Sequence, residues 1–408
     1  MTAQGVLHGI RVLDFTWVWA GPIMCRHLAD YGAEVVTIEN PDYIDLARQL
    51  IYKDGEYDPD MAIAYTNFNA GKKSVSLNMA EPEAIDIVKR LVGISDVVIE
   101  SMTPKAMRRW GLTYDDLRQI KPDIIMLSTC MQGQTGPYSM SPGNGAILPA
   151  LAGISEVTGW PDRGPTGQGG PYTDFLAGAM GAAAVMTALV HRERTGEGQY
   201  IDLSQNECSM QFLTPAFLDY SANGRVASRL GNRRPGYAPH GVYRCAGEEE
   251  SWCTISVRTD AEWQALCEAL GQPDWVRDAK FATRQSRETH AEALDAHLSS
   301  WTEQHSAQQV MERLQRAGVP AAVVHDAAGL DADPQLAHRQ HYARTEHPRI
   351  GENVIDRYGF RLSATPGAVQ VPAPLLGQHN DHVLGDLLGL SQEDIDRLTT
   401  AGVVVAVA

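Results

Sequence analysis

The first 130 residues alternate between short apolar runs and amphipathic segments. The apolar runs are rich in β-branched residues, as expected of buried strands, and the segments between them follow the period of a helix. The predicted strands are residues 10–16, 34–40, 96–101 and 123–130, and the predicted helices are 21–33, 81–94 and 113–122. Because strands that alternate with helices form parallel sheets, this region is predicted to be a doubly wound α/β sheet.

The rest of the chain predicts a continuation of this sheet and a second, smaller domain. A loop rich in Gly, Pro and Ser at 132–145 is followed by a long apolar helix at 172–192 and a strand at 199–204. A further helix then ends near Asn223. Strands and helices then resume after a polar loop at 229–241 and end with a strand at 319–326. We therefore predict a large Rossmann-like domain from residues 1–223 and 327–408, and a small α/β domain from 224–326.

Charge and cysteine usage exclude several classes of function. The formal net charge of -16 argues against nucleic acid or an anionic membrane as the main partner. No segment has the pattern of a membrane span or of a signal peptide, and the six cysteines are scattered without a C-x-x-C motif. We expect a cytoplasmic protein with reduced, mostly buried thiols. The thirteen histidines show no metal-ligand spacing, so no metal is expected.

The first strand–helix turn does not have the pattern of a dinucleotide site. It reads "TWVWAGP", with Trp17 and Trp19 where a bound pyrophosphate requires bare glycine backbone. Glu39, at the end of the second strand, is therefore interpreted as a solvated carboxylate rather than a ribose ligand.

Two basic clusters lie next to predicted strands. Lys72 and Lys73 precede the strand "SVSL", and "PKAMRRWG" places Arg109 directly after the strand at 96–101. Ligands of doubly wound sheets bind at the carboxyl ends of the strands. Either cluster alone is better explained as solvated surface charge, but together, in an acidic chain, they indicate a ligand that carries phosphate.

Asp174 stands at the start of the long apolar helix. Such an Asp is most commonly a helix cap that accepts hydrogen bonds from free amides. However, it follows the glycine-rich loop "GQGGPYT", which can bring backbone amides close to a ligand, and the helix behind it consists of small residues. A carboxylate at a helix N-terminus stays ionised, and an ionised carboxylate is a competent nucleophile toward an activated acyl group.

The chain as a whole resembles the family III CoA-transferases, which include formyl-CoA transferase, carnitine CoA-transferase and the α-methylacyl-CoA racemases. The resemblance depends on an ordered series of segments along nearly the full length: "GIRVLDFTWVWAGP", "GAEVVTIENP", "NAGKKSVSLN", "DVVIESMTPKAMRRWGL", "TDFLAGAMG", "RTGEGQYIDLS" and "PLLGQHNDHVLGDLLGL". It implies the two domains described above and an intertwined dimer in which two chains are linked as rings.

The resemblance also implies a site and a reaction. Asp174 would attack the donor thioester, and the reaction would pass through an aspartyl anhydride and an aspartyl-CoA thioester. The CoA contacts would come from Val18, Ala20, Lys73 and Arg109, and CoA thioesters would be substrates, with no permanently bound cofactor. The partners would be an acyl-CoA, a carboxylic acid, and a second copy of the chain or a homologous subunit.

Departures from formyl-CoA transferase indicate an acceptor larger than formate or oxalate. Trp19 stands where that enzyme has a glutamine, Asn40 where it has an arginine, and its "GGGGQ" loop is replaced by "GNRRPGYAPHG". We therefore expect a dicarboxylic or aromatic acid, with Trp17 and Trp19 in the substrate pocket and Arg233 and Arg234 as carboxylate contacts.

Two alternatives to an active CoA-transferase stay open. One is a racemase or epimerase of α-methylacyl-CoA, and the other is a catalytically weak CoA-binding subunit of a heteromeric transferase. The racemases need a histidine where Asn144 stands in the substrate pocket, and asparagine does not exchange a proton near neutral pH. Retention of Asp174 argues against the weak subunit.

Overall fold

The computed structural model describes residues 5–55, 57–103, 105–247, 251–369 and 371–405. The chain forms two compact units. Unit 1 contains Met1–Ser155, Gly167–Val226 and Leu336–Ala408, and unit 2 contains Glu156–Thr166 and Ala227–Gln335. The predicted boundaries differ from this division in three places, because residues 156–166 and 327–335 belong to unit 2 and residues 224–226 belong to unit 1.

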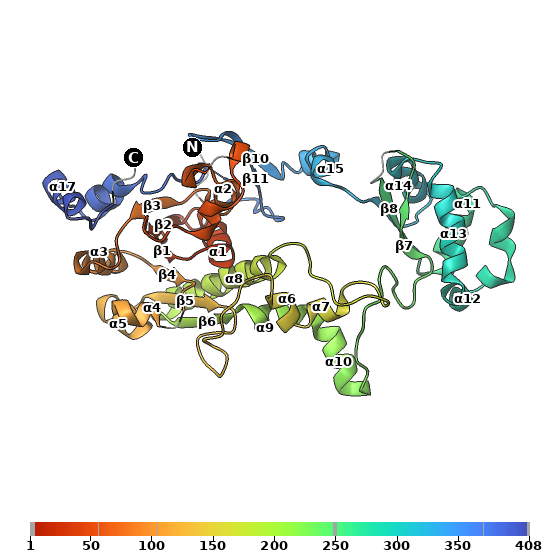
Figure 1. Cartoon of the computed structure of the whole chain (residues 1–408), viewed down its shortest axis with the longest axis horizontal. Coiled ribbons are helices and arrows are strands. Elements are labelled where there is room, and N and C mark those ends of the chain that lie inside the picture. Colours follow the sequence, from red (N-terminus) through yellow and green to blue (C-terminus); the bar gives the residue numbers. More distant parts are fainter. Residues whose placement is uncertain (1–4, 56, 104, 248–250, 370, 406–408) are drawn as a thin grey trace. The chain divides into compact units, whose positions relative to one another are not determined.

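Unit 1 is built on a six-stranded parallel sheet in the order β3-β2-β1-β4-β5-β6, as the alternating pattern predicted (Figure 1). Its strands are β1 Arg11–Phe15, β2 Glu34–Glu39, β3 Lys73–Ser76, β4 Val97–Glu100, β5 Ile125–Cys130 and β6 Tyr200–Ser204. In the centre of the sheet, Val12 of β1 lies opposite Val35 of β2 and Val97 of β4. The strand order reverses direction between β1 and β4, which is where doubly wound sheets bind ligands.

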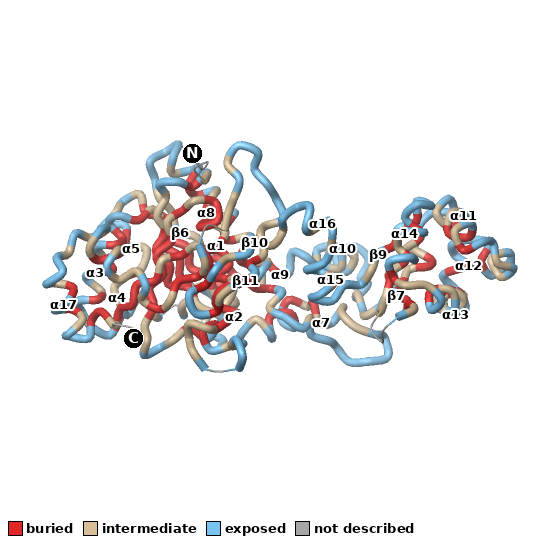
Figure 2. The backbone as a smooth tube through the Cα atoms, turned by 90° about the horizontal axis from the view of Figure 1, so that it is seen from above, coloured by how far each residue is buried: buried red, intermediate tan, exposed pale blue. Residues whose placement is uncertain are grey.

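Helices cover both faces of this sheet, and successive strand residues are buried on opposite faces. Val12 and Val35 pack against α1 Ala20–Asp30 and α8 Tyr172–Thr195. Leu13 and Val36 face the other layer, which contains α3 Pro82–Gly93, α4 Ala106–Trp110, α5 Tyr114–Ile120 and α17 Gln392–Thr400. Burial on both faces explains why the strands are continuously apolar and not alternating; Figure 2 shows them as buried.

Helix α8 approaches α1 closely because glycines face the contact. A Cβ at Gly178 would lie 2.7 Å from Cγ2 of Ile23, and one at Gly181 would overlap the side chain of Met24. The helix is long and apolar enough to cross a membrane by length and composition. Its apolar side chains Ala177 and Val185, however, are part of the core of unit 1.

The remaining elements of unit 1 connect these layers. The predicted helix before Asn223 is divided into α9 Gln205–Met210, η4 Gln211–Leu213 and α10 Thr214–Asn223, and the break lies beside Pro215, whose nitrogen carries no N–H. An antiparallel hairpin, β10 Tyr342–His347 and β11 Gly351–Asp356, was not predicted. The other short elements are η1 Leu46–Gln49, η2 Lys53–Gly55, η3 Pro59–Met61, α2 Ile63–Asn69, α6 Leu148–Leu151 and a π-helix, η7 His382–Leu387. Two more, α7 Ile154–Val157 and α16 Pro334–His338, contain residues of both units.

Unit 2 is a small α/β structure with a core of its own. Its antiparallel sheet has the order β7-β8-β9, with β7 His240–Arg244, β8 Trp252–Ser256 and β9 Ala321–Val323. The helices and turns are α11 Asp260–Ala269, η5 Asp274–Arg277, η6 Ala279–Phe281, α12 Arg284–Thr289, α13 Ala291–Thr302, α14 Ala307–Arg316 and α15 Ala327–Asp331. Trp263, Leu298 and Val310 are among the buried residues that join the sheet to these helices.

Candidate active site

A cavity of about 990 Å³ opens at the carboxyl ends of four parallel strands in unit 1. Trp17 follows β1, Ser101 follows β4, Cys130 ends β5 and Gln205 follows β6, and all four residues line the cavity. The cavity therefore includes the point between β1 and β4 where the strand order reverses. Its location agrees with the general rule for ligand sites in open parallel sheets.

The turn between β1 and α1 forms one wall of this cavity. Val18 has a φ of 67°, in the left-handed region that β-branched residues rarely adopt. Trp19 packs edge-on against Phe68, with ring centroids 4.6 Å apart. Helix α1 begins directly after this turn, at Ala20, so its first free N–H groups are next to the cavity.

Asp174 lines the same cavity from the first turn of α8. The residue at the N-cap position is Pro171, which has no side-chain cap, and the N–H of Asp174 donates to the carbonyl of Pro171 at 3.0 Å. The Asp174 side chain is only 6% exposed, and among the described residues its Oδ2 atom has no hydrogen-bond partner. Asp174 is thus not the N-cap of α8, and one of its oxygens is left available to a bound molecule.

The environment of Asp174 shifts its acidity in two opposing ways. Burial raises the pKa of the carboxyl to about 6, while hydrogen bonds from the N–H groups of Ala20 and of Asp174 itself act in the opposite direction. The carboxyl is therefore mostly ionised at neutral pH. Because burial removes water from this carboxylate, its negative charge is less solvated than that of a surface Asp.

Gly145 is a site residue that the sequence reasoning missed. A Cβ atom at this position would overlap Oδ2 of Asp174, so any side chain would displace the carboxylate or occupy its place. The loop "SPGNGA" that contains Gly145 has the composition of an ordinary polar turn, so the sequence gives no signal for this contact. The tertiary structure brings Gly145 next to Asp174. Glycine is required here for close approach and not for a left-handed φ.

The structure brings together most of the predicted pocket residues. Trp17, Val18, Trp19, Ala20, Asn144 and Asp174 all line the cavity. Asn144 is exposed, and its Oδ1 accepts a hydrogen bond from the N–H of Ala146 at 3.0 Å. It therefore also shapes its own loop. The predicted glycine-rich loop contributes Gly167, Gly169 and Gly170.

The structure places the two lysines elsewhere than the sequence suggested. Lys72 is 1% exposed, and its ammonium donates to Asp14 at 2.9 Å and to Asn69 at 2.8 Å, so it supports the core of unit 1. Lys73 begins β3, and its ammonium lies 2.5 Å from Glu34 at the start of β2. Both ends of that pair are at the amino edge of the sheet, opposite the cavity. Neither lysine is among the residues that line it.

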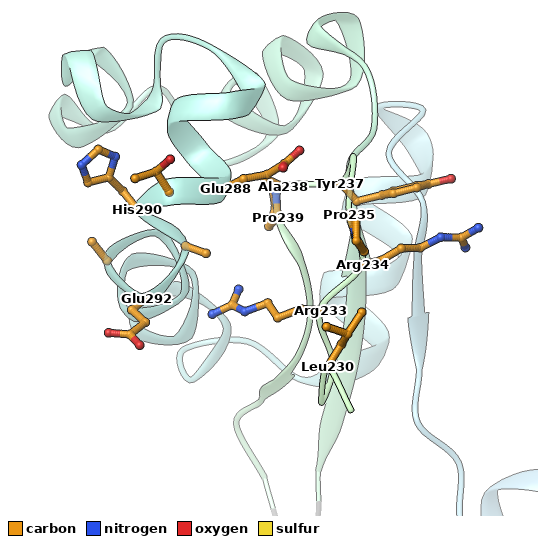
Figure 3. A pocket seen from close by; sticks show the side chains of 13 residues that line it. Leu230, Arg233, Arg234, Pro235, Tyr237, Ala238, Pro239, Glu288, His290 and Glu292 are labelled. Carbon is orange, nitrogen blue, oxygen red and sulfur yellow. The ribbon is translucent and has the colours of Figure 1, made fainter. Parts of the chain in front are cut away.

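The remaining predicted contacts are outside the cavity lining. Arg109 is exposed on α4, close after the carboxyl end of β4, and has no ion-pair partner among the described residues. Arg233 and Arg234 line a separate pocket of about 620 Å³ in unit 2 (Figure 3). Arg233 pairs with Asp295 at 2.5 Å, whereas the Arg234 guanidinium lies 4.7 Å from the ring centre of Tyr237.

The interpretation of Glu39 as a solvated carboxylate is wrong. It is buried and accepts from Arg48 through both oxygens, at 2.8 and 3.0 Å. Among the described residues, no group of three His, Cys, Asp or Glu side chains is placed to hold a metal ion.

The fold and the site together define an α/β protein with a buried carboxylate in a cavity at the carboxyl edge of its sheet. The sequence profile of CoA-transferase family III matches residues 7–380. The chain therefore belongs to the family III CoA-transferases, and like its relatives it is an enzyme that transfers CoA from an acyl-CoA to a carboxylate.

Relatives with named activities are similar over nearly the whole chain. Succinyl-CoA–D-citramalate CoA-transferase of Chloroflexus aurantiacus is 35% identical over 98% of both chains. The β subunit of succinyl-CoA–L-malate CoA-transferase from the same organism is 32% identical, also over 98% of both chains. Human succinyl-CoA:glutarate CoA-transferase is 28% identical over 98% of this chain and 90% of its own.

Solved structures are similar at the level of the whole fold. The crystal structure of a CAIB/BAIF family protein from Brucella suis has a TM-score of 0.86 and 29% identity, covering 94% of this chain and all of the other. Rv3272 from Mycobacterium tuberculosis has a TM-score of 0.79 and 28% identity, covering 93% of this chain and 99% of its own.

Proposed function

We propose that this enzyme transfers CoA from succinyl-CoA, or a similar donor, to a small dicarboxylic acid, with Asp174 as the nucleophile. The observation that supports the proposal most directly is the Asp174 carboxylate itself. It is buried, it lines a cavity large enough for an acyl group, and one of its oxygens has no partner among the described residues. Covalent catalysis divides one difficult transfer into two easier ones.

The reaction runs as two successive acyl exchanges on Asp174. The carboxylate attacks the thioester carbonyl, the C–S bond breaks, and a mixed anhydride and CoA thiolate result. The thiolate then attacks the aspartyl carbonyl, which releases the donor acid and leaves an aspartyl-CoA thioester. The acceptor carboxylate attacks this thioester to give a second anhydride and free thiolate. The thiolate finally attacks the acceptor's acyl carbonyl and regenerates the Asp174 carboxylate.

Two features of the site assist these steps. The backbone of Ala20, at the start of α1, favours the ionised form of the Asp174 carboxyl, and the positive end of the α1 dipole favours its negative charge. The cavity holds no other charged residue among its described lining. A neighbouring cation that would hold the carboxylate in an unreactive ion pair is therefore not present in that lining.

The names of the relatives favour a dicarboxylic acceptor over an aromatic one. The three named above act with citramalate, malate and glutarate, and a bacterial relative is a succinate–glutarate CoA-transferase. We propose Arg233 and Arg234 as contacts of the second carboxylate, since planar guanidinium groups bind carboxylates through two parallel hydrogen bonds. Backbone groups of Val18 and Ala20, together with Arg109, are the proposed CoA contacts.

The proposed assembly is a cytoplasmic dimer of two interlinked chains, formed either by two copies or with a homologous subunit. Relatives named as α and β subunits support the second possibility. Linked chains must unfold to separate, so dilution to nanomolar concentration should yield no folded monomer by mass photometry. A folded monomer at that concentration would contradict the linkage.

Trapping of the intermediate tests the mechanism. Incubation with succinyl-CoA and hydroxylamine should modify wild-type enzyme at Asp174, as located by peptide mass spectrometry. Asp174→Asn keeps the shape of the side chain but removes its charge, and it should lose transfer by at least about 10³-fold. Asp162→Asn, which changes an exposed carboxylate, is the matched control and should remain active. Turnover by Asp174→Asn at a near wild-type rate, with no adduct at this residue, would refute the mechanism.

A further inference from the structure

The turn before α1 is held by three side chains from three different places in the fold. The N–H of Thr16 donates to Asp14 at 2.8 Å, the N–H of Trp17 donates to Oγ of Ser101 at 2.9 Å, and the N–H of Val18 donates to Asp45 at 3.0 Å. Three successive backbone donors thus have side-chain acceptors. Such an arrangement fixes the path of the turn at each residue.

Val18 is the residue in this turn that most needs support. Its φ of 67° brings a β-branched side chain close to its own backbone, and at such positions glycine is ordinarily found. The alternative, a φ in the ordinary negative range, would redirect the chain at the residue that precedes Trp19 and Ala20. The hydrogen bond from Val18 to Asp45 is specific to the conformation observed, so it favours that conformation over the unstrained one.

Asp45 is itself held in place. It is buried, and the same Oδ1 atom accepts a second hydrogen bond from the N–H of Ala47 at 2.9 Å, which caps the short helix η1. The helix carries Arg48, which is fully buried and forms the two-oxygen pair with Glu39 at the end of β2. A continuous chain of contacts therefore runs from the edge of the sheet through η1 to Val18.

We propose that Asp45 is a positioning residue for the transfer reaction. It does not line the cavity, and it acts by holding Val18 in the conformation in which the turn and Asp174 line the same cavity. The inference depends on the proposed function in one respect, namely that the Asp174 carboxylate is the reacting group. Nothing in it requires Asp45 to touch the substrate.

The first test separates the hydrogen bond from the charge. Asp45→Ala removes the acceptor and should lower kcat about 10- to 100-fold and also raise KM for acyl-CoA, because the turn lines the cavity with Asp174 and supplies proposed CoA contacts. Asp45→Asn retains an acceptor oxygen and should keep kcat within about 3-fold of wild type. Equal losses in the two variants, or none in either, would overturn the proposal.

The matched control removes a similar cap elsewhere. Asp278 in unit 2 caps the short helix η6 by accepting from the N–H of Lys280 at 2.9 Å, but it holds no strained residue. Asp278→Ala should therefore leave kcat unchanged. A loss equal to that of Asp45→Ala would show that removal of any such cap is sufficient, and would overturn the positioning role.

The second test uses the strain at Val18. Glycine adopts a positive φ without steric cost, so a Val18→Gly chain needs the Asp45 hydrogen bond less. In that background, Asp45→Ala should lower kcat by only about 2- to 5-fold relative to Val18→Gly alone. If the Asp45→Ala loss is the same in both backgrounds, Asp45 does not act through the conformation of Val18.

Hydrogen exchange distinguishes failure of this inference from failure of the proposed function. Asp45→Ala should speed amide exchange in residues 16–20 whether or not Asp174 is the nucleophile. If Asp174→Asn is active while Asp45→Ala exchanges its amides faster, Asp174 is not the nucleophile, but Asp45 still supports the turn. Unchanged exchange in residues 16–20 would overturn the role of Asp45 itself.

Discussion

The cavity of unit 1 and the pocket of unit 2 differ in whether a charged side chain in their lining has an ion-pair partner: Asp174 has none in the described lining, whereas Arg233 has one. The described lining of the cavity carries one charged side chain, Asp174, whose burial raises its pKa to about 6. In the pocket of unit 2, Arg233 is paired with Asp295, which also accepts from the hydroxyl of Tyr243 at 2.7 Å. A charge without a counter-ion is costly to bury but reactive, and a paired charge is stable but less available.

The same contrast exists inside unit 1, between Asp174 and the Lys72–Asp14 pair. The pair is fully buried, and Asp14 accepts further hydrogen bonds from Thr16 and Thr37. We therefore expect the paired charges to matter for stability and the lone charge to matter for chemistry. Each of the following experiments tests one side of this division, beginning with the largest expected effect.

Lys72→Met should destabilise the protein more than any other change considered. It leaves Asp14 as a buried carboxylate without its cation, which typically costs about 3–5 kcal/mol of unfolding free energy. Lys73→Met, which removes a half-exposed ion pair, should cost no more than about 1 kcal/mol. Urea denaturation measures both. Equal stability of the two variants would show that burial of Lys72 does not distinguish it from its neighbour.

Gly145→Ala should displace the Asp174 carboxylate and leave the buried Lys72–Asp14 pair unchanged. Its Cβ would overlap Oδ2 of Asp174, and a displacement of about 1 Å in a reacting group costs about 100-fold in rate. Gly164→Ala is the control, because a Cβ at Gly164 meets no atom within 4 Å. Transfer assays with succinyl-CoA compare the two, and a Gly145→Ala enzyme with half of the wild-type rate would contradict the observed proximity.

Asp174→Asn should stabilise the folded protein at high pH. Because the folded pKa of about 6 lies above the ordinary value of 3.8, burial of the charged form costs stability above pH 6. That cost decreases as the pH falls through 6 toward 3.8, because the carboxyl is protonated in the folded state before it is protonated in the unfolded state. The variant should gain about 2–3 kcal/mol over wild type at pH 8 and less than about 1 kcal/mol at pH 4, as measured by urea denaturation. A gain that does not depend on pH would exclude burial of the charge as its cause.

The same shift predicts the pH dependence of the reaction. Only the ionised carboxylate attacks a thioester, so kcat should fall as the pH decreases through about 6. The profile should be measured with saturating acyl-CoA. A constant kcat down to pH 4.5 would contradict the combination of a raised Asp174 pKa and the proposed role of Asp174 as the nucleophile.

Arg234→Gln should have the smallest effect, limited to the acceptor. Its guanidinium lies against the Tyr237 ring and is exposed, so it is more available to a ligand than Arg233. Its loss should raise KM for a dicarboxylic acceptor about 5- to 10-fold and leave KM for a monocarboxylic acid unchanged. Arg244→Gln, at another exposed arginine of unit 2, is the control. Equal effects on both acids would remove Arg234 from the acceptor site.

The sequence alone was sufficient to predict the parallel sheet and to single out Asp174 as a candidate site residue. Buried strands and amphipathic helices are encoded by local periodicity, so β1, β2, β4 and β5 lie within one or two residues of their predicted positions. The glycine-rich loop before Asp174 and the small residues of α8 drew attention to this residue, but its role as a nucleophile came from the family resemblance and stays a prediction. The hairpin β10–β11 was missed because its alternation of polar and apolar residues is weak and half-exposed.

Only the tertiary structure decided which charges are paired and which residues stand next to Asp174. Lys72 meets Asp14, Gly145 meets Asp174, and Asp45 meets Val18 across 58, 29 and 27 positions of sequence. A lysine after a glycine turn has the same local sequence whether it is solvated or buried, and Gly145 is in a loop like any other. Pairing and close approach depend on the three-dimensional position of a partner, and local periodicity contains no information about that position.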